Sequence, residues 1–132
     1  MNLNKFTEKF ANEIGGQYSE YDEDKCVIIM PLAENRFQAV LAIARQPDGQ
    51  DSLAFVFTSK VCEYTEKIDL KELLKQNYNF NFAKFVIVDE IIKVEASSLI
   101  ENASEALLKQ MILEVANSAD EWEYKLTGLD VN

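Results

Sequence analysis

The sequence predicts an α+β domain in which three helices pack against a twisted, five-stranded antiparallel sheet. Apolar residues recur at helical spacing near both ends of the chain, and runs rich in β-branched and aromatic residues lie between them. A helix-capping pattern interrupts these runs near the middle of the chain. The expected order is therefore one helix, three strands, a second helix, two strands and a third helix.

The first expected element is a short amphipathic helix. Its apolar side chains recur every three or four residues, at Leu3, Phe6, Phe10 and Ile14. Gly15 and Gly16 follow and predict the end of the helix, because glycine readily adopts the left-handed conformation found there. Residues 17–25 are polar and acidic, and a short strand around Tyr18 remains open.

Three strands are expected next, over residues 26–32, 37–45 and 53–64. Residues 33–35 and 46–51 separate them, and the second of these segments, with Pro47 and Gly49, is a strong turn signal. Neighbouring strands joined by short turns most simply form an antiparallel meander.

A second helix is predicted over residues 70–77, where Asp69 can cap the free backbone N–H groups and Glu72 can complete a capping box. Strands over residues 83–88 and 91–97 follow, joined by a turn at Asp89 and Glu90. The last expected element is a long helix over residues 102–127, which Gly128 ends. One apolar face runs along that helix: Leu107, Leu108, Met111, Ile112, Val115, Ala116, Ala119, Trp122 and Leu126.

Composition is that of one folded domain, which we expect to span residues 1–132. Of the 132 residues, 48% are hydrophobic and 27% are charged, so the chain can bury a sizeable core. The 13 basic and 23 acidic side chains give a net charge of −10, which argues against nucleic acid and anionic membranes as partners.

Histidine, the usual general base and a common metal ligand, is absent from the sequence. Cys26 and Cys62 are expected as reduced, packed thiols on strands, far apart in the sequence. Glu20, Asp22 and Asp24 lack the glycine and the further oxygen ligands of a calcium loop. We therefore expect a binding protein and no enzyme, with no metal and no cofactor. No signal peptide or transmembrane run is recognisable, so the expected location is the cytoplasm.

The strands are unusual because they are apolar on both faces. Residues 37–45 put Phe37, Ala39, Leu41 and Ile43 on one side and Val40, Ala42 and Ala44 on the other. The first and last helices can cover one face. The second face must then meet the other helices, another subunit or a bound partner.

Three segments carry a resemblance to a known family: Phe6 and Phe10 with the Ile14-Gly15-Gly16 ending, residues 70–77 before a hairpin, and residues 104–122. With the order of elements, they make the chain similar to the class I type III secretion chaperones, the Tir chaperone family, and to the related YbjN-like fold. The resemblance implies a small, acidic, bacterial homodimer. It also implies that the dimer holds an extended segment of a client protein in apolar grooves, without ATP.

The resemblance also implies roles for individual residues. Carried over, the groove formed by the first helix and the sheet would use Phe6, Phe10, Val27 and Ile29 to bind the client. The second helix and the strands after it would supply the dimer interface, through Leu73, Leu74, Phe80 and Phe82. Two alternatives stay open: a YbjN-like regulatory or scaffolding domain that contacts a folded partner, and a small-ligand-binding or enzymatic domain that uses Asp89 and Glu90.

Overall fold

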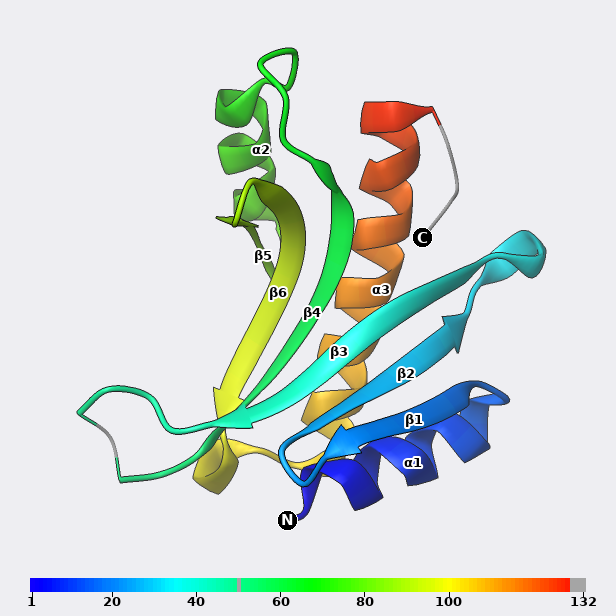
Figure 1. Ribbon diagram of the computed structural model, residues 1–132, viewed down its shortest axis with the longest axis vertical. Coiled ribbons are helices and arrows are strands. Elements are labelled where there is room, and N and C mark those ends of the chain that lie inside the picture. The colour runs from blue at the N-terminus through cyan, green and yellow to red at the C-terminus, as the bar shows by residue number, and fades with distance from the viewer. Residues whose placement is uncertain (50, 129–132) are drawn as a thin grey trace.

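The computed structural model describes residues 1–49 and 51–128 of the chain. The described residues form three α-helices and a six-stranded antiparallel sheet, which confirms the α+β class (Figure 1). The helices are α1 (Leu3–Ile14), α2 (Leu70–Gln76) and α3 (Glu105–Thr127). The strands are β1 (Gln17–Asp22), β2 (Lys25–Pro31), β3 (Phe37–Arg45), β4 (Ala54–Glu63), β5 (Lys84–Val88) and β6 (Ile91–Leu99).

The strands lie in the order β1-β2-β3-β4-β6-β5. The expected meander is present as β2, β3 and β4, and the expected hairpin as β5 and β6. Val27 pairs with Leu41 across β2 and β3, and Leu41 pairs with Thr58 across β3 and β4. This register fixes which side chains share a face of the sheet.

The sheet has one strand more than the five expected, because β1 pairs with β2 at one edge. Its sequence is polar, and Tyr18 is the one residue of this strand that is not exposed. An edge strand with almost no buried side chain carries no alternating apolar pattern, so sequence periodicity identifies it poorly.

Helix ends in the described part of the chain follow much of the expected chemistry, with one change of boundary and without the expected capping box, since Glu72 Oε1 accepts a hydrogen bond from Gln76 Nε2 at 3.4 Å. Gly15 caps α1 in the left-handed conformation, with φ of 71°, and Asp69 Oδ1 accepts a hydrogen bond from the backbone N–H of Glu72 at 3.2 Å. Helix α3 begins at Glu105 instead of residue 102, since the Ser104 side chain accepts the hydrogen bond from the backbone N–H of Leu107. Residues 100–102 form a short 3₁₀ turn before it.

Helices α1 and α3 cover the same face of the sheet, and Figure 1 views the sheet from the other side, with α3 behind β3 and β4. Two ion pairs join these helices at the surface: Lys109 to Glu13 at 2.9 Å and Lys9 to Glu105 at 3.3 Å. The hydrogen bond from Lys109 holds the pKa of Glu13 below its usual range.

The core lies between the sheet and these two helices. Its largest fully buried apolar side chains are Phe55, Phe57, Ile28, Met30, Ile92, Leu108, Met111, Ile112, Val40 and Val56. Strand β4 is buried on both faces from Ala54 to Ser59. Figure 1 shows the β1–β3 part of the sheet turned strongly against the β4–β6–β5 part, as the twist of a sheet requires.

Candidate protein-binding face

The face of the sheet opposite α1 and α3 carries a continuous apolar surface on β2 and β3. We call it the open face and define it by six residues: Val27, Ile29, Phe37, Ala39, Leu41 and Ile43. The register sets Val27 beside Leu41 and Ile29 beside Ala39, so the two rows are contiguous. Phe37 is 54% exposed, and Val27, Ile29, Leu41 and Ile43 are half-buried.

The inward-pointing residues of the same strands explain why this surface exists. Ile28, Val40 and Ala42 are each 0% exposed and pack under the helices. The strands alternate, so their remaining apolar residues must point away from the helices. An exposed apolar surface rimmed by polar residues is typical of a site for another protein.

Polar groups border the open face on both sides. Gln17 and Ser19 of β1 pair with Ile29 and Val27 on one side, and both are exposed. On the other side, Thr58 of β4 pairs with Leu41 and is 6% exposed. Within residues 1–49 and 51–128, Thr58 Oγ1 finds no hydrogen-bond partner. A buried hydroxyl without a partner is costly to the fold.

The structure separates the four residues expected to bind a client. Val27 and Ile29 lie on the open face. Phe6 and Phe10 are 4% and 3% exposed, stack on each other at 6.2 Å between ring centroids, and belong to the core beneath α1. A client would contact these two rings only if α1 moved.

Four residues of the open face were not among the expected client contacts: Phe37, Ala39, Leu41 and Ile43. The sequence did indicate that these residues form an apolar surface, because residues 37–45 are apolar on both faces of the strand. Asp89 and Glu90 lie exposed in the turn of the β5–β6 hairpin. These are the carboxylates that the small-ligand-binding or enzymatic alternative would use.

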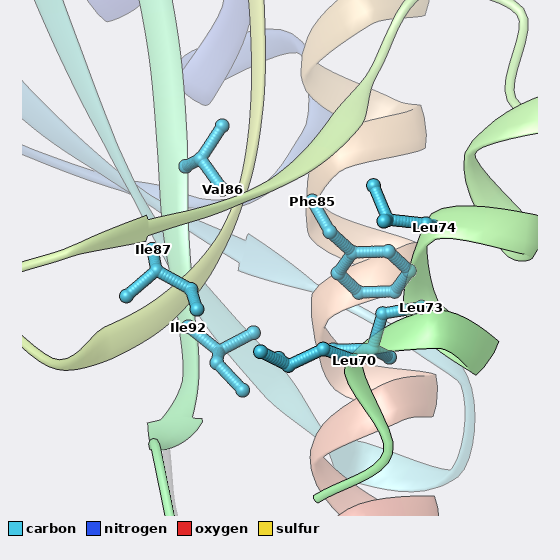
Figure 2. Close-up of a pocket in the computed structure, with 7 residues that line it drawn as sticks. All are labelled: Leu70, Leu73, Leu74, Phe85, Val86, Ile87 and Ile92. Carbon is cyan, nitrogen blue, oxygen red and sulfur yellow. The ribbon is translucent and has the colours of Figure 1, made fainter.

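The residues expected at a dimer interface lie around α2 and β5. Leu74 is 69% and Phe82 is 38% exposed, whereas Leu73 is 4% exposed and Phe80 is half-buried. An apolar pocket of about 340 Å³ opens between α2 and the β5–β6 hairpin. Figure 2 shows the side chains that line it: Leu70, Leu73, Leu74, Phe85, Val86, Ile87 and Ile92.

A carboxylate on α3 holds the loop between α2 and β5. Glu114 accepts hydrogen bonds from three consecutive backbone N–H groups, those of Asn81, Phe82 and Ala83, at 2.9, 2.8 and 2.7 Å. The ring of Phe85, just beyond the loop, packs edge-on against Trp122 of α3 at 5.4 Å. These contacts fix the backbone of the loop that carries the exposed Phe82.

The two cysteines are free thiols and are buried, Cys26 to 0% and Cys62 to 8% exposed. Burial raises the pKa of both thiols, and the nearby Glu123 carboxylate raises that of Cys62 further. Such thiols are poor nucleophiles. In the described ranges, none of the helices has the length and apolar composition needed to cross a membrane.

Known structures with a similar arrangement of helices and strands identify the fold of this chain. The chain is similar to a chain in the HopA1–SchA chaperone–effector complex, with 14% identity, a TM-score of 0.60, and coverage of 90% of this chain and 91% of that one. It is also similar to a chain of the heterodimeric ExoU–SpcU complex of the Pseudomonas aeruginosa type III secretion system, with 9% identity, a TM-score of 0.58, and coverage of 96% and 98%. This chain has a type III secretion chaperone-like fold.

The ExsC–ExsE complex provides a further match to this chaperone-like fold, with 16% identity, a TM-score of 0.51, and coverage of 93% and 91%. No family model matches the sequence, and no curated protein matches it either. At these identities the likeness concerns the arrangement of the backbone and not individual residues. The roles of single residues must therefore come from the chemistry of this chain.

Proposed function

We propose that this protein is a chaperone-like binding protein that holds an extended segment of a client protein on the open face. The observation that carries the proposal is the contiguous apolar surface of β2 and β3, whose residues stay partly exposed although their neighbours in the strands are fully buried. The proposed role requires no catalytic group, no cofactor and no metal ion.

The physical basis of binding would be the removal of apolar surface from water. Each square ångström of apolar surface buried contributes about 25 cal/mol, so a few client side chains seated on this face would supply several kcal/mol. An extended client segment suits the face, because its side chains alternate with the same spacing as those of the sheet.

The comparisons support a protein as the partner. The matched structures are a chaperone–effector complex and two further protein complexes. The net charge of −10 fits the same role, since like charge limits non-specific aggregation of a protein with exposed apolar surface.

We further propose that two copies associate through α2 and β5 and that residues 1–132 act as one unit. Leu74 lines the pocket between α2 and the β5–β6 hairpin and is largely exposed, and Phe82 adds exposed apolar area on the loop before β5. Strand β5 is also an edge of the sheet in the described part of the chain, so one of its sides is open to another strand. The open face lies on β2 and β3, away from this surface, and would stay accessible in the dimer.

The alternative of a YbjN-like regulatory or scaffolding domain predicts contact with a folded partner instead of an unfolded segment. The two kinds of partner place different demands on the open face. A folded partner must match the shape of this face over a large area, whereas an extended segment needs only alternating side chains.

Capture of partners from the native host tests the proposal. The wild-type protein should retain one dominant protein through a short stretch of its chain, identified by limited proteolysis and mass spectrometry. Leu41→Asp and the more exposed Phe37→Ser should lose that protein. Leu113→Asp is the matched control, because Leu113 is 42% exposed on α3, on the covered side of the sheet. Equal capture by all the variants would contradict a role for the open face.

A further inference from the structure

A second, polar cleft lies between the short 3₁₀ turn η1 (Ala33–Asn35) and the C-terminal half of α3. Its volume is about 680 Å³, twice that of the apolar pocket at α2. The residues that line it are Glu34, Arg36, Asn117, Asp120, Glu121, Tyr124 and Lys125.

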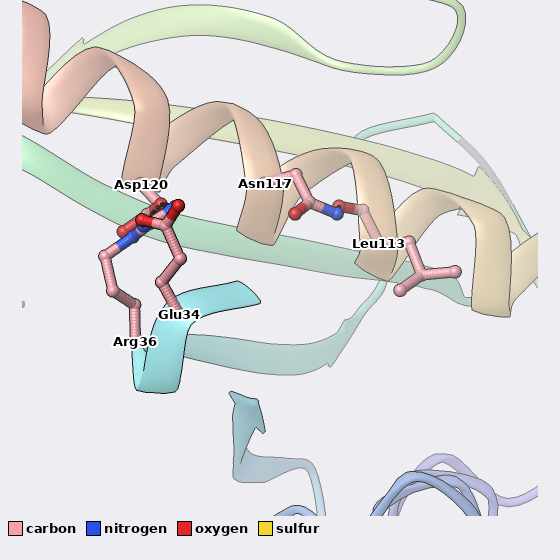
Figure 3. A network of polar contacts seen from close by, with 5 residues as sticks. All are labelled: Glu34, Arg36, Leu113, Asn117 and Asp120. Atoms are coloured by element: carbon pink, nitrogen blue, oxygen red, sulfur yellow. Dashed lines mark hydrogen bonds and ion pairs between the residues drawn. The ribbon is translucent and has the colours of Figure 1, made fainter. Parts of the chain in front are cut away.

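The centre of the cleft is a buried carboxylate. Asp120 is 5% exposed, and its Oδ2 accepts a hydrogen bond from Arg36 Nε at 3.0 Å and forms an ion pair with Arg36 Nη2 at 3.0 Å (Figure 3). Arg36 Nη1 reaches Glu34 Oε2 at 2.8 Å. The second oxygen of Asp120, Oδ1, is buried and has no partner among the residues that the structure describes.

An unpartnered carboxylate oxygen can only accept a hydrogen bond, so its missing partner must be a donor. In Figure 3 the Asn117 side chain lies further along α3 and is directed away from Asp120, where its Nδ2 donates to the backbone oxygen of Leu113 at 2.9 Å. A buried carboxylate that lacks one of its donors leaves a desolvation cost that a ligand with an N–H group would remove.

The charge of the cleft favours a cationic donor. Its three carboxylates, on Glu34, Asp120 and Glu121, face two cations, Arg36 and Lys125, which leaves one negative charge in excess. Both cations are already in ion pairs, with Lys125 Nζ at 2.9 Å from Glu121 Oε1. The described residues contain no group of three or more side chains suited to hold a metal ion, so the fitting cation is organic.

A guanidinium group fits these features better than an ammonium group. It is planar, presents several N–H donors in fixed directions, and stacks on aromatic rings. Tyr124 lines the cleft and is 65% exposed, so its ring can accept such stacking. Because Asp120 Oδ1 is covered, the guanidinium would reach it by displacing side chains that line the cleft.

The cleft is close in sequence to the open face. Arg36 belongs to the cleft, and the next residue, Phe37, begins the row of open-face side chains on β3. Because successive residues of a strand point to opposite faces, the cleft and the open face meet at the beginning of β3 from opposite sides of the sheet. We propose that the cleft binds an arginine side chain of the client segment at the point where that segment passes the beginning of β3. This inference rests on the proposed function for the identity of the occupant, whereas the site itself is tested without any client.

The test uses a small probe and nuclear magnetic resonance. N-acetyl-arginine methylamide is titrated into the ¹⁵N-labelled protein, and the citrulline analogue, which is neutral and of the same shape, is titrated in parallel. The arginine probe should shift the backbone amides of residues 33–37 and 117–125 in a saturable way, and the citrulline probe should not. Equal shifts with both probes, or no saturable shift with arginine, would overturn the proposal.

Variants locate the site. Asp120→Asn should weaken arginine binding about tenfold or more, the effect of losing one hydrogen bond to a charged group. Glu121→Gln, at a more exposed position, should weaken it by a smaller factor without disturbing the buried pair. Glu101→Gln, an exposed carboxylate on another turn, should bind as the wild type does. Wild-type affinity in folded Asp120→Asn and Glu121→Gln would place the bound probe elsewhere and refute the site.

The Leu41→Asp variant separates this proposal from the proposed function. It should still bind the arginine probe, because Leu41 lies outside the cleft. If it binds the probe but the wild type captures no client, the proposed function fails and the cation site stands. If the wild type captures a client but the probe gives no saturable shift, the cation site fails alone.

Discussion

The Oε1 atom of Glu114 lies 2.7 Å from the backbone nitrogen of Ala83 and accepts its hydrogen bond. The same carboxylate also accepts the N–H groups of Asn81 and Phe82, so one side chain of α3 satisfies three donors of the loop between α2 and β5. Consecutive N–H groups that converge on one anion form a concave anion site, here filled by the protein itself. The loop that carries Phe82 is thereby fixed to the long helix.

Replacing Glu114 should therefore loosen both the loop and the proposed dimer. We expect Glu114→Ala to lower the free energy of unfolding by about 1–3 kcal/mol, because it removes three hydrogen bonds to a charged group, of which the one from Ala83 is partly buried. Glu114→Gln should lose less stability, since its amide oxygen still accepts a hydrogen bond from the loop. Urea unfolding measures the effect, with Glu121→Ala as the control at an exposed position. An unchanged midpoint in Glu114→Ala would show that the loop is held by other contacts.

Phe10 is a core residue, and its removal should cost stability. The ring is 3% exposed, stacks on Phe6, and has Lys109 Nζ at 5.7 Å from its centroid. We expect Phe10→Ala to lower the free energy of unfolding by about 3–5 kcal/mol, as large-to-small core changes do. Phe37→Ala, at a ring that is 54% exposed, should cost far less in the same urea titration. Equal losses would mean that the two rings are equally buried in solution.

The proposed dimer should depend on exposed leucine at α2. Leu74 is 69% exposed, so Leu74→Asp should leave the fold intact but place a charge in an apolar interface. Sedimentation velocity should show a change from dimer to monomer at a concentration where the wild type is dimeric. Leu113→Asp, with Leu113 42% exposed on α3, should stay dimeric. A wild type that is monomeric at every concentration would exclude this assembly.

The β5–β6 turn stores backbone strain that a glycine should release. Asp89 and Glu90 have φ values of 51° and 63°, the left-handed region that non-glycine residues adopt at a cost of about 1–2 kcal/mol. We expect Glu90→Gly to raise the free energy of unfolding by about 1 kcal/mol, since the backbone oxygen of Glu90 keeps its hydrogen bond from Tyr64. Glu90→Ala removes the same side chain without releasing the strain, so it should give no gain. Thermal unfolding of the three proteins distinguishes these outcomes.

The buried thiols should make the protein less stable at high pH. Their pKa is raised in the folded state, so their contribution is complete below the unfolded thiol pKa of about 8.5 and falls as pH rises above it. Because the chain lacks histidine, we expect a flat urea midpoint between about pH 6 and 8 and a decline above. Cys62→Ala should reduce that decline. A urea midpoint that increases as the pH is raised above about 8.5 would contradict a raised pKa of the two thiols in the folded protein.

Most of the fold follows from local sequence patterns. The spacing of Phe6 and Phe10 and the glycine after Ile14 define α1, and Asp69 caps α2 as its type and position suggest. Strand β1 was the element that the sequence predicted least well, because an exposed edge strand has no buried side chains to impose a pattern on its sequence.

The site was less predictable than the fold, since burial depends on which face each helix covers. A helical pattern shows that Phe6 and Phe10 share one side of α1, but it does not show that this side faces the sheet instead of a partner. The apolar pattern of residues 37–45 indicated two buried faces without identifying the open one. The cleft at Asp120 joins residues 84 positions apart, so no local pattern could predict it.

A site-specific cross-link tests the central claim most directly. A photoreactive phenylalanine analogue at position 37 would lie on the open face, and the same analogue at position 113 would lie on α3, on the opposite side of the sheet. Irradiated in the native host, the protein should cross-link from position 37 to a short segment of one dominant client and give no such product from position 113. Cross-linking of that client from position 113 instead of 37 would contradict the open face as the binding surface.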